Sequence, residues 1–308
     1  MPVLRLNARP QGLAIHGSAA CADGALRRAA AGTGPIIVMI HGYKYLPGHP
    51  RHCPHVSIFK SGATHVQCWP RNLGFGGGDP DEGLAIAFGW DARGALWDVA
   101  ARAVAAGEVL ASAIRILSRA APHRPVHIIT HSMGSEVALS ALHHLPRGAV
   151  ARVLALTAAS YRSRAEEALA TDAGRTAELL NITSGENDIF DAAFECLVRA
   201  PQRGDRALGT GLSARNAVTI QIDCHTTLGA LSQLAGPIAA PSRRICHWSA
   251  YLRPGVLDFY QTAMRAPERL PLATLQHMLP GARTPRFAHL LPLRSRARGL
   301  PSANVAAS

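Results

Sequence analysis

A serine, Ser132, stands at the junction between an apolar run and a stretch of helical character. The apolar run covers residues 126–130, and the serine is the central residue of the string T-H-S-M-G, residues 130–134. Where a buried strand turns sharply into a helix, the turn holds such a serine in a strained backbone conformation with its hydroxyl exposed. The spacing is small-x-Ser-x-Gly, with Thr130 where glycine is usual. The string predicts a nucleophile elbow with Ser132 as the nucleophile; the competing interpretation is a serine that caps the helix.

A second strand end carries groups that such a nucleophile needs. His41 and Gly42 follow directly after the continuous apolar run 36–40, about 90 residues before the serine. A His-Gly pair at this place shapes a loop whose backbone N–H can stabilise an oxyanion. We therefore expect the backbone N–H groups of Met133 and Tyr43 to form the oxyanion hole. The alternative is that Gly42 is simply a turn glycine.

Strand-like and helical segments alternate along the chain around these two points. Continuous apolar runs bounded by turn residues are typical of strands buried on both faces of a parallel sheet. The alternation predicts a mostly parallel central sheet with helices on both faces. Strands are expected at 36–40, 126–130, 150–157, 178–183 and 217–222, and helices at 93–118, 133–145 and 256–264.

One domain is expected over residues 1–280, beginning with a hairpin at about residues 3–16. Only about 20 residues separate the strand expected at 150–157 from the next strand, so no large lid domain is expected. Beyond residue 280, proline, glycine and arginine recur every few residues. This pattern predicts an irregular, arginine-rich extension over residues 281–308 that catalysis does not need.

Four strings in this arrangement resemble the α/β-hydrolase superfamily. They are residues 36–42, residues 130–134, S-G-E-N-D at 184–188 and H-W-S-A-Y at 247–251. The resemblance covers about residues 30 to 265. It implies the α/β-hydrolase fold and serine chemistry, and it leaves the substrate open because the loops set the specificity of this fold.

The resemblance also implies the order of a catalytic triad, which is serine, then acid, then histidine. Asp188 follows the strand expected at 178–183 and is the predicted acid, with Asp191 and then Glu186 as alternatives. His247 is the predicted base, because it precedes the last expected helix. His225 is the alternative base, and it would leave a surplus strand and helix after it.

The function predicted from these residues is hydrolysis of a carboxylic ester or thioester through an acyl-enzyme. The expected partner is a small-molecule acyl substrate, and no cofactor is expected. Two alternatives remain at this point. One is an acyltransferase with the same triad, and the other is a non-catalytic binding protein on the same fold.

A cluster of potential metal ligands follows the strand expected at 36–40. His49, His52, Cys53 and His55 lie within seven residues. Imidazole and thiol ligands suit zinc, but zinc sites usually combine two separated pairs of ligands and the chain has one cluster. No metal site is predicted, and the segment is expected at the rim of the active site.

Composition places the chain among globular proteins. Of 308 residues, 48% are apolar and 17% charged, which excludes an intrinsically disordered chain, and no apolar run reaches the length of a membrane span. Six scattered cysteines and the absence of a secretory signal predict a cytoplasmic protein with reduced thiols. The net charge is +12, but the basic residues are almost all arginine, so we expect compositional bias and no nucleic-acid partner. The oligomeric state is left open.

Overall fold

The computed structural model of the chain describes residues 3–60, 68–281 and 283. Its strands form one eight-stranded sheet in the order β2-β1-β4-β3-β5-β6-β7-β8. Neighbouring strands run parallel, except that β2 is antiparallel to β1 and forms with it the hairpin predicted at the start of the chain. The strands are β1 (Val3–Arg9), β2 (Gly12–Ile15), β3 (Ile36–Ile40), β4 (Leu84–Gly89), β5 (Val126–His131), β6 (Arg152–Leu156), β7 (Glu178–Thr183) and β8 (Ala217–Gln221).

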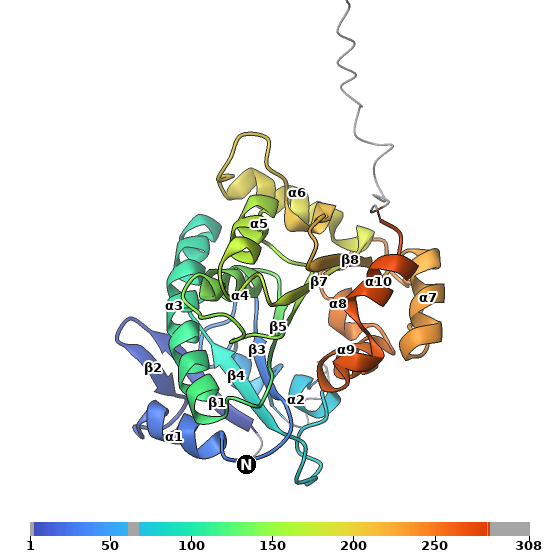
Figure 1. Ribbon diagram of the computed structural model, residues 1–308. Coiled ribbons are helices and arrows are strands. Elements are labelled where there is room, and N and C mark those ends of the chain that lie inside the picture. Colours follow the sequence, from blue (N-terminus) through green and yellow to red (C-terminus); the bar gives the residue numbers. More distant parts are fainter. Residues whose placement is uncertain (1–2, 61–67, 282, 284–308) are drawn as a thin grey trace, which may run out of the picture.

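Helices cover both faces of this sheet, as Figure 1 shows. On one face lie α1 (Ala22–Ala29), α3 (Leu96–Ala120), α4 (Gly134–Leu142) and α5 (Arg162–Ala170). On the other lie α2 (Trp69–Asn72), α7 (His225–Ala235), α8 (Ser249–Leu252), α9 (Val256–Arg265) and α10 (Leu272–Met278). The remaining helical segments are α6 (Asp188–Leu197) and four short 3-10 turns, η1 (Pro54–Val56), η2 (Gly185–Asn187), η3 (Leu208–Thr210) and η4 (Pro267–Arg269).

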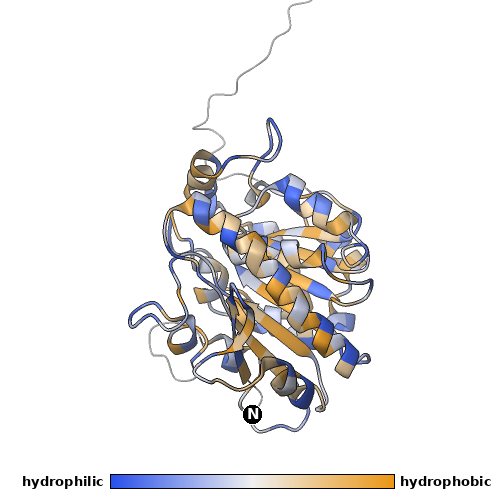
Figure 2. Ribbon diagram, turned by 90° about the vertical axis from the view of Figure 1, so that its left-hand side faces the viewer, coloured by the Kyte–Doolittle hydropathy of each residue, from blue (hydrophilic) through white to orange (hydrophobic). Residues whose placement is uncertain are grey.

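The two faces of the sheet form two separate apolar cores. In β3, all five residues are buried, and their side chains alternate between the two cores. Ile36 and Val38 pack with α3 and α4, whereas Ile37 and Met39 pack with α9. In Figure 2 the strands are hydrophobic along most of their length, while the helices carry hydrophobic and hydrophilic residues side by side. The continuous apolar runs of the sequence therefore correspond to strands covered on both faces.

The longest helix, α3, packs closely against α4, the helix that follows Ser132. Gly107 lies at this contact, where a Cβ would come within 2.8 Å of the carbonyl oxygen of Val137 and would also crowd Ser140. A glycine in a helix costs about 1 kcal/mol relative to alanine, and here it lets the two helix backbones approach. This close packing fixes the position of α4 behind Ser132.

The sequence analysis does not predict the helices α1, α2, α6, α8 and α10 or the strand β4. The strand β4 follows a glycine-rich loop and has one β-branched residue, Ile86, among alanines and a glycine, so its strand signal is weak. The helix α6 starts with Asp188, directly after β7 and η2, where the sequence predicts a loop. Between β6 and β7 the chain forms α5 alone, so the fold has no large lid domain.

Within the described residues, no helix has both the length and the apolar character needed to cross a membrane. All six cysteines are free thiols in the structure. The predicted extension over residues 281–308 lies outside the described residues except for Gly281 and Arg283.

Candidate active site

Ser132 occupies a strained turn between β5 and α4. Its φ angle is 54°, in the left-handed region that residues other than glycine rarely adopt. Its backbone N–H donates to the carbonyl oxygen of Leu156 in β6, 3.0 Å away, which ties the turn to the neighbouring strand. Gly134 is required by the same turn, because a Cβ there would lie 2.6 Å from the carbonyl oxygen of His41. The local geometry is that of a nucleophile elbow.

Thr130 takes the place of the first elbow glycine without opening the turn. Its Oγ1 lies 2.6 Å from Oγ of Ser135, so the two hydroxyls form a hydrogen bond across the elbow. Both side chains are buried. The larger residue is therefore accommodated by a polar contact between the end of the strand and the start of the helix.

The 41–43 loop lies directly against Ser132. A Cβ on Gly42 would come within 2.7 Å of Cβ of Ser132, so only glycine allows this approach. In the part of the chain that the structure describes, the backbone N–H groups of Met133 and Tyr43 have no backbone acceptor. Met133 and Tyr43 therefore remain the predicted oxyanion donors.

His41 shapes this loop through both of its ring nitrogens. Its Nδ1 lies 2.9 Å from the Gly42 carbonyl oxygen, and its Nε2 accepts from the Trp90 backbone N–H at 3.1 Å. Burial lowers the pKa of His41 to about 3, so the ring is neutral and its Nδ1–H donates to Gly42. The Trp90 indole N–H donates to the His41 carbonyl at 3.0 Å. Trp90 is thus a positioning residue that the sequence analysis did not identify.

His247 reaches the elbow from the loop before α8. Its carbonyl oxygen accepts from Nε2 of His131, the residue before Ser132, at 2.9 Å, and from Oγ1 of Thr157 at 3.3 Å. Its ring lies 4.6 Å from the His131 ring and stacks on Phe190, with centroids 4.7 Å apart. Burial, with the neighbouring His131, lowers the pKa of His247 well below its ordinary value, which favours the neutral imidazole that a general base requires.

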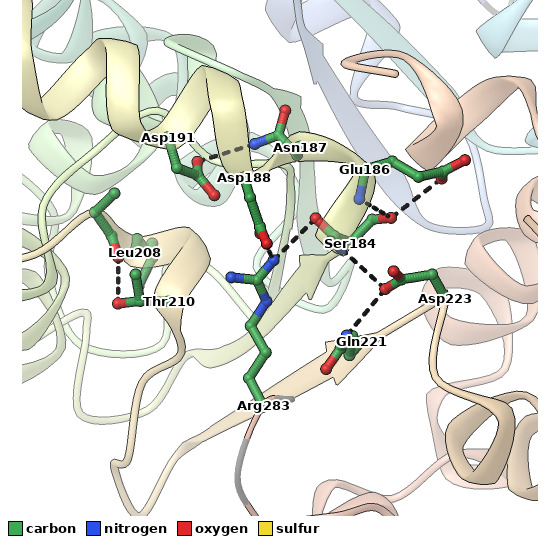
Figure 3. Close-up of polar contacts among 12 residues, drawn as sticks. Ser184, Glu186, Asn187, Asp188, Asp191, Leu208, Thr210, Gln221, Asp223 and Arg283 are labelled. Carbon is green, nitrogen blue, oxygen red and sulfur yellow. Dashed lines mark hydrogen bonds and ion pairs between the residues drawn. The ribbon is translucent and has the colours of Figure 1, made fainter. Parts of the chain in front are cut away.

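The residue that holds the His247 ring from behind is Asn187. Its Oδ1 lies 2.6 Å from His247 Nδ1, so the Nδ1–H donates to the amide oxygen and Nε2 remains available as an acceptor. The structure places Asn187 where the sequence predicts Asp188. Asp188, the next residue, forms an ion pair with Arg283, which also donates to the carbonyl oxygen of Ser184 at 3.0 Å (Figure 3).

The other candidate acids and the other candidate base have different surroundings. Glu186 is buried in an ion pair with Arg253. Asp191 accepts a hydrogen bond from Nδ2 of Asn187 at 2.9 Å, and burial raises its pKa to about 7. His225 is exposed at the start of α7. The structure therefore places the 41–43 loop against Ser132 and ties His247 to His131, the residue before Ser132, with Asn187 and Asp191 behind His247.

A cavity of about 250 Å³ lies beside the elbow, between α3, α4 and α6. Met133, the residue after Ser132, is among the residues that line it. Trp97, Tyr161 and Phe194 supply aromatic walls, and the remaining lining residues are Ala100, Ala101, Val104, Glu136, Ala159, Arg164, Val198, Arg199 and Pro201. Its mainly apolar walls are suited to an apolar group attached to the reacting carbonyl.

The cluster of potential metal ligands has other contacts. His55 is buried with Nε2 2.7 Å from Oδ1 of Asn7, and Sγ of Cys53 accepts from the Gly48 backbone N–H at 3.2 Å. His49 and His52 pack against each other, with ring centroids 4.8 Å apart. No group of three or more His, Cys, Asp or Glu side chains in the described residues is arranged to hold a metal ion.

Sequence comparison agrees with this geometry. The protein-family model "Alpha/beta hydrolase of unknown function (DUF900)" matches residues 25–160. The matched range spans β3, the 41–43 loop, the elbow and β6, and it ends before Asn187 and His247. No curated protein matches the chain. The sheet order, the turn at Ser132 and this match all agree with the α/β-hydrolase fold.

Proposed function

We propose that this protein is a serine hydrolase that cleaves a carboxylic ester or thioester through an acyl-enzyme. The observation that carries the proposal is the strained Ser132, with a φ angle of 54°, facing the backbone of Gly42 and two amides that have no backbone acceptor in the described chain. Left-handed strain at a residue other than glycine costs about 1–3 kcal/mol and clusters at functional sites. A serine that only capped a helix would not need it.

Each residue has a separate role in the proposed reaction. Oγ of Ser132 attacks the carbonyl carbon, and Nε2 of His247 takes the hydroxyl proton. The amides of Met133 and Tyr43 stabilise the oxyanion, each worth about 10²–10³ in rate. His247 then returns the proton to the leaving oxygen or sulfur. Water, deprotonated by His247, attacks the acyl-enzyme, and the acid leaves as Ser132 regains its proton.

Asn187 takes the role that the sequence predicts for Asp188. Its amide oxygen accepts the Nδ1–H of His247 and so fixes the tautomer in which Nε2 is the base. An asparagine serves in the same position in cysteine proteases of the papain type, so the role does not require a carboxylate in direct contact. Asp188 is engaged by Arg283 and lies on a different side of α6.

The cavity beside Met133 supports a short apolar acyl group. Its 250 Å³ falls below the range of roughly 300–1,000 Å³ typical of pockets for drug-sized ligands. Trp97 lies at the N-terminal end of α3 and is 59% exposed, which is consistent with a side chain at the cavity entrance. The expected substrates are small esters or thioesters with short acyl chains.

Kinetics with a panel of p-nitrophenyl esters and acyl thioesters of increasing chain length tests the proposal. We expect turnover of short chains by the wild type, loss of turnover in Ser132→Ala, and a decline in kcat/KM once the chain exceeds the cavity. A matched control is Ser135→Ala, which removes the other hydroxyl of the elbow. Turnover that survives in Ser132→Ala would refute the proposed nucleophile. A folded wild type that hydrolyses none of the panel would favour a binding protein.

A further inference from the structure

A second buried carboxylate stands behind the base. Asp191, in α6, is only 6% exposed, and its Oδ1 accepts from Nδ2 of Asn187 at 2.9 Å. Its Oδ2 has no hydrogen-bond partner among the residues that the structure describes. Gly209 in η3 makes room for it, because a Cβ on that glycine would overlap the carboxylate. A buried carboxylate with an unsatisfied oxygen is costly, and its retention needs an explanation.

The explanation lies in the chain of hydrogen bonds from Asp191 to His247. An asparagine amide has an accepting end, Oδ1, and a donating end, Nδ2. A carboxylate accepts but does not donate, so Asp191 binds the Nδ2 end (Figure 3) and thereby turns Oδ1 toward His247. If the amide were reversed, two N–H groups would face each other at His247 Nδ1.

Helical geometry explains why Asp191 and not Asp188 takes this place. Asn187 and Asp191 are four residues apart and lie on the same side of the first turn of α6. Asp188 is rotated away from them and faces Arg283. The charged groups around Asp191 are Asp188 and Glu195 on its own helix, which raise its pKa, and Arg283 from beyond α10, which lowers it.

We propose that Asp191 is a positioning residue that acts on His247 through Asn187, orienting the amide and supplying the negative charge that stabilises the imidazolium. The inference rests on the proposed function, in which His247 becomes positively charged when Ser132 attacks. In this arrangement the carboxylate does not contact the histidine directly, because the side chain of Asn187 lies between them. Asn187 transmits its effect, because an amide whose N–H groups face a carboxylate has a more strongly accepting oxygen.

The test is Asp191→Asn, which keeps the size of the side chain and removes its charge. We expect kcat on a short ester to fall about 100-fold while KM changes by less than about threefold, since the interaction matters after the substrate has bound. We also expect the wild-type kcat/KM profile to show an acidic limb near pH 7, where Asp191 takes up its proton and its charge is lost, and we expect this limb to be absent from D191N. A purely structural role would lower activity without removing this limb.

Glu195→Gln is the matched control. It removes one negative charge from the same helix, one turn further along, where Glu195 pairs with Arg206 and contacts neither Asn187 nor His247. We expect this variant to keep kcat and to keep an acidic limb, moved to slightly lower pH because Glu195 no longer raises the pKa of Asp191. Loss of the limb in both variants would mean that general charge, and not the hydrogen-bonded chain, determines the limb, and would overturn the proposal.

An exchange of the two residues gives a second, independent test. The double variant N187D/D191N puts the carboxylate next to His247 and an amide behind it. We expect it to recover activity to within about tenfold of the wild type, because one carboxylate and one oriented amide are still present. If D191N does not fold, this variant alone decides, with thermal unfolding as the check. A folded exchange variant with no more activity than Asn187→Ala would contradict the proposal.

Failure of this inference is distinguishable from failure of the proposed function. If turnover requires Ser132 but D191N keeps the wild-type kcat and acidic limb, only the role of Asp191 is refuted. If turnover does not require Ser132, the proposed function itself fails.

Discussion

At the scale of residues, the His247 ring is fixed from several directions. Its carbonyl is held by His131 and Thr157, its Nδ1 by Asn187, and its ring by stacking on Phe190. The backbone contact to His131 is the most informative, because His131 immediately precedes Ser132. The histidine is thereby tied to the strand end that carries the nucleophile, and general base catalysis depends on such placement before it depends on pKa.

We predict that His247→Gln folds normally and lowers kcat about 1,000-fold or more, because the proton acceptor is lost. His225→Gln is the control, since His225 is exposed at the start of α7 and should tolerate the change. Steady-state kinetics on a short ester with both variants checks this. If His225→Gln is inactive and His247→Gln remains active, the base is His225 and not His247.

Asp191 also makes a prediction about stability. The unfolded chain loses this proton near pH 4, whereas the folded chain keeps it up to about pH 7. Between these values the folded state binds more protons, so the free energy of unfolding contributed by this group falls as pH rises. A pKa raised from 3.8 to about 7 corresponds to ~4 kcal/mol of the free energy of unfolding, which is lost as the pH rises through this range.

Asp191→Asn should therefore lose less stability than the wild type when the pH rises from about 5 to about 8. Thermal unfolding of both proteins at the two pH values measures this. Parallel changes in Tm for the two proteins would show that Asp191 is already ionised at the lower pH.

At the scale of elements, the elbow and the 41–43 loop act as one unit. The sequence could predict both, because an apolar strand followed by small residues and a helix start is a local pattern. The spacing between them in three dimensions is not local. The distance between the two depends on β3 and β5 being neighbours in the sheet, with Ile40 paired to Thr130. It also depends on Gly42, which has no Cβ to collide with Ser132.

Gly42→Ala tests this unit. The added Cβ would lie 2.7 Å from Cβ of Ser132, so the 41–43 loop must move away from the nucleophile. We predict a loss of kcat of about 100-fold, similar to the removal of one oxyanion donor. Gly77→Ala is a control, because a Cβ on Gly77 meets nothing within 4 Å. Retention of wild-type kcat in Gly42→Ala would argue against the 41–43 loop as part of the oxyanion hole.

The helix α6 shows where prediction from sequence stops. Its apolar residues Phe190, Phe194 and Leu197 have helical spacing and would suggest a buried apolar face. In the structure only Phe194 of these three is buried, Leu197 is 51% exposed, and Asp191 is buried beside Phe194. Propensity and hydrophobicity cannot indicate that a carboxylate faces inward, because the reason lies in Asn187 and in His247, 60 residues away. For the same reason the sequence favours Asp188 over its neighbour Asn187.

At the scale of the whole molecule, the sheet order brings together parts of the chain that are far apart. The 41–43 loop, the elbow, α6 and the loop before α8 all lie at the carboxyl ends of parallel strands, where ligands bind in open α/β sheets. The alternation of strands and helices was enough to predict this architecture. The end of the chain was less predictable: Arg283 lies beyond the predicted boundary at residue 280, yet its side chain is only 4% exposed and pairs with Asp188.

Two truncations test the importance of Arg283. We predict that a chain ending at residue 285 keeps its Tm and its kcat on a short ester. A chain ending at residue 280 should lose about 3 kcal/mol, because removing one partner leaves the Asp188 carboxylate without its guanidinium. Arg283→Ala in the full chain separates this contact from the rest of the extension and should reproduce the loss. Equal stability of all four proteins would show that residues beyond 280 are dispensable.

The central claim, that Ser132 is an activated nucleophile, is tested most directly by covalent labelling. The protein is treated with a fluorophosphonate, and the site of the adduct is located by peptide mass spectrometry. We predict one adduct, on Ser132, with much slower labelling in His247→Gln and none in Ser132→Ala. An adduct on another residue, or a folded wild type that does not react, would contradict the account.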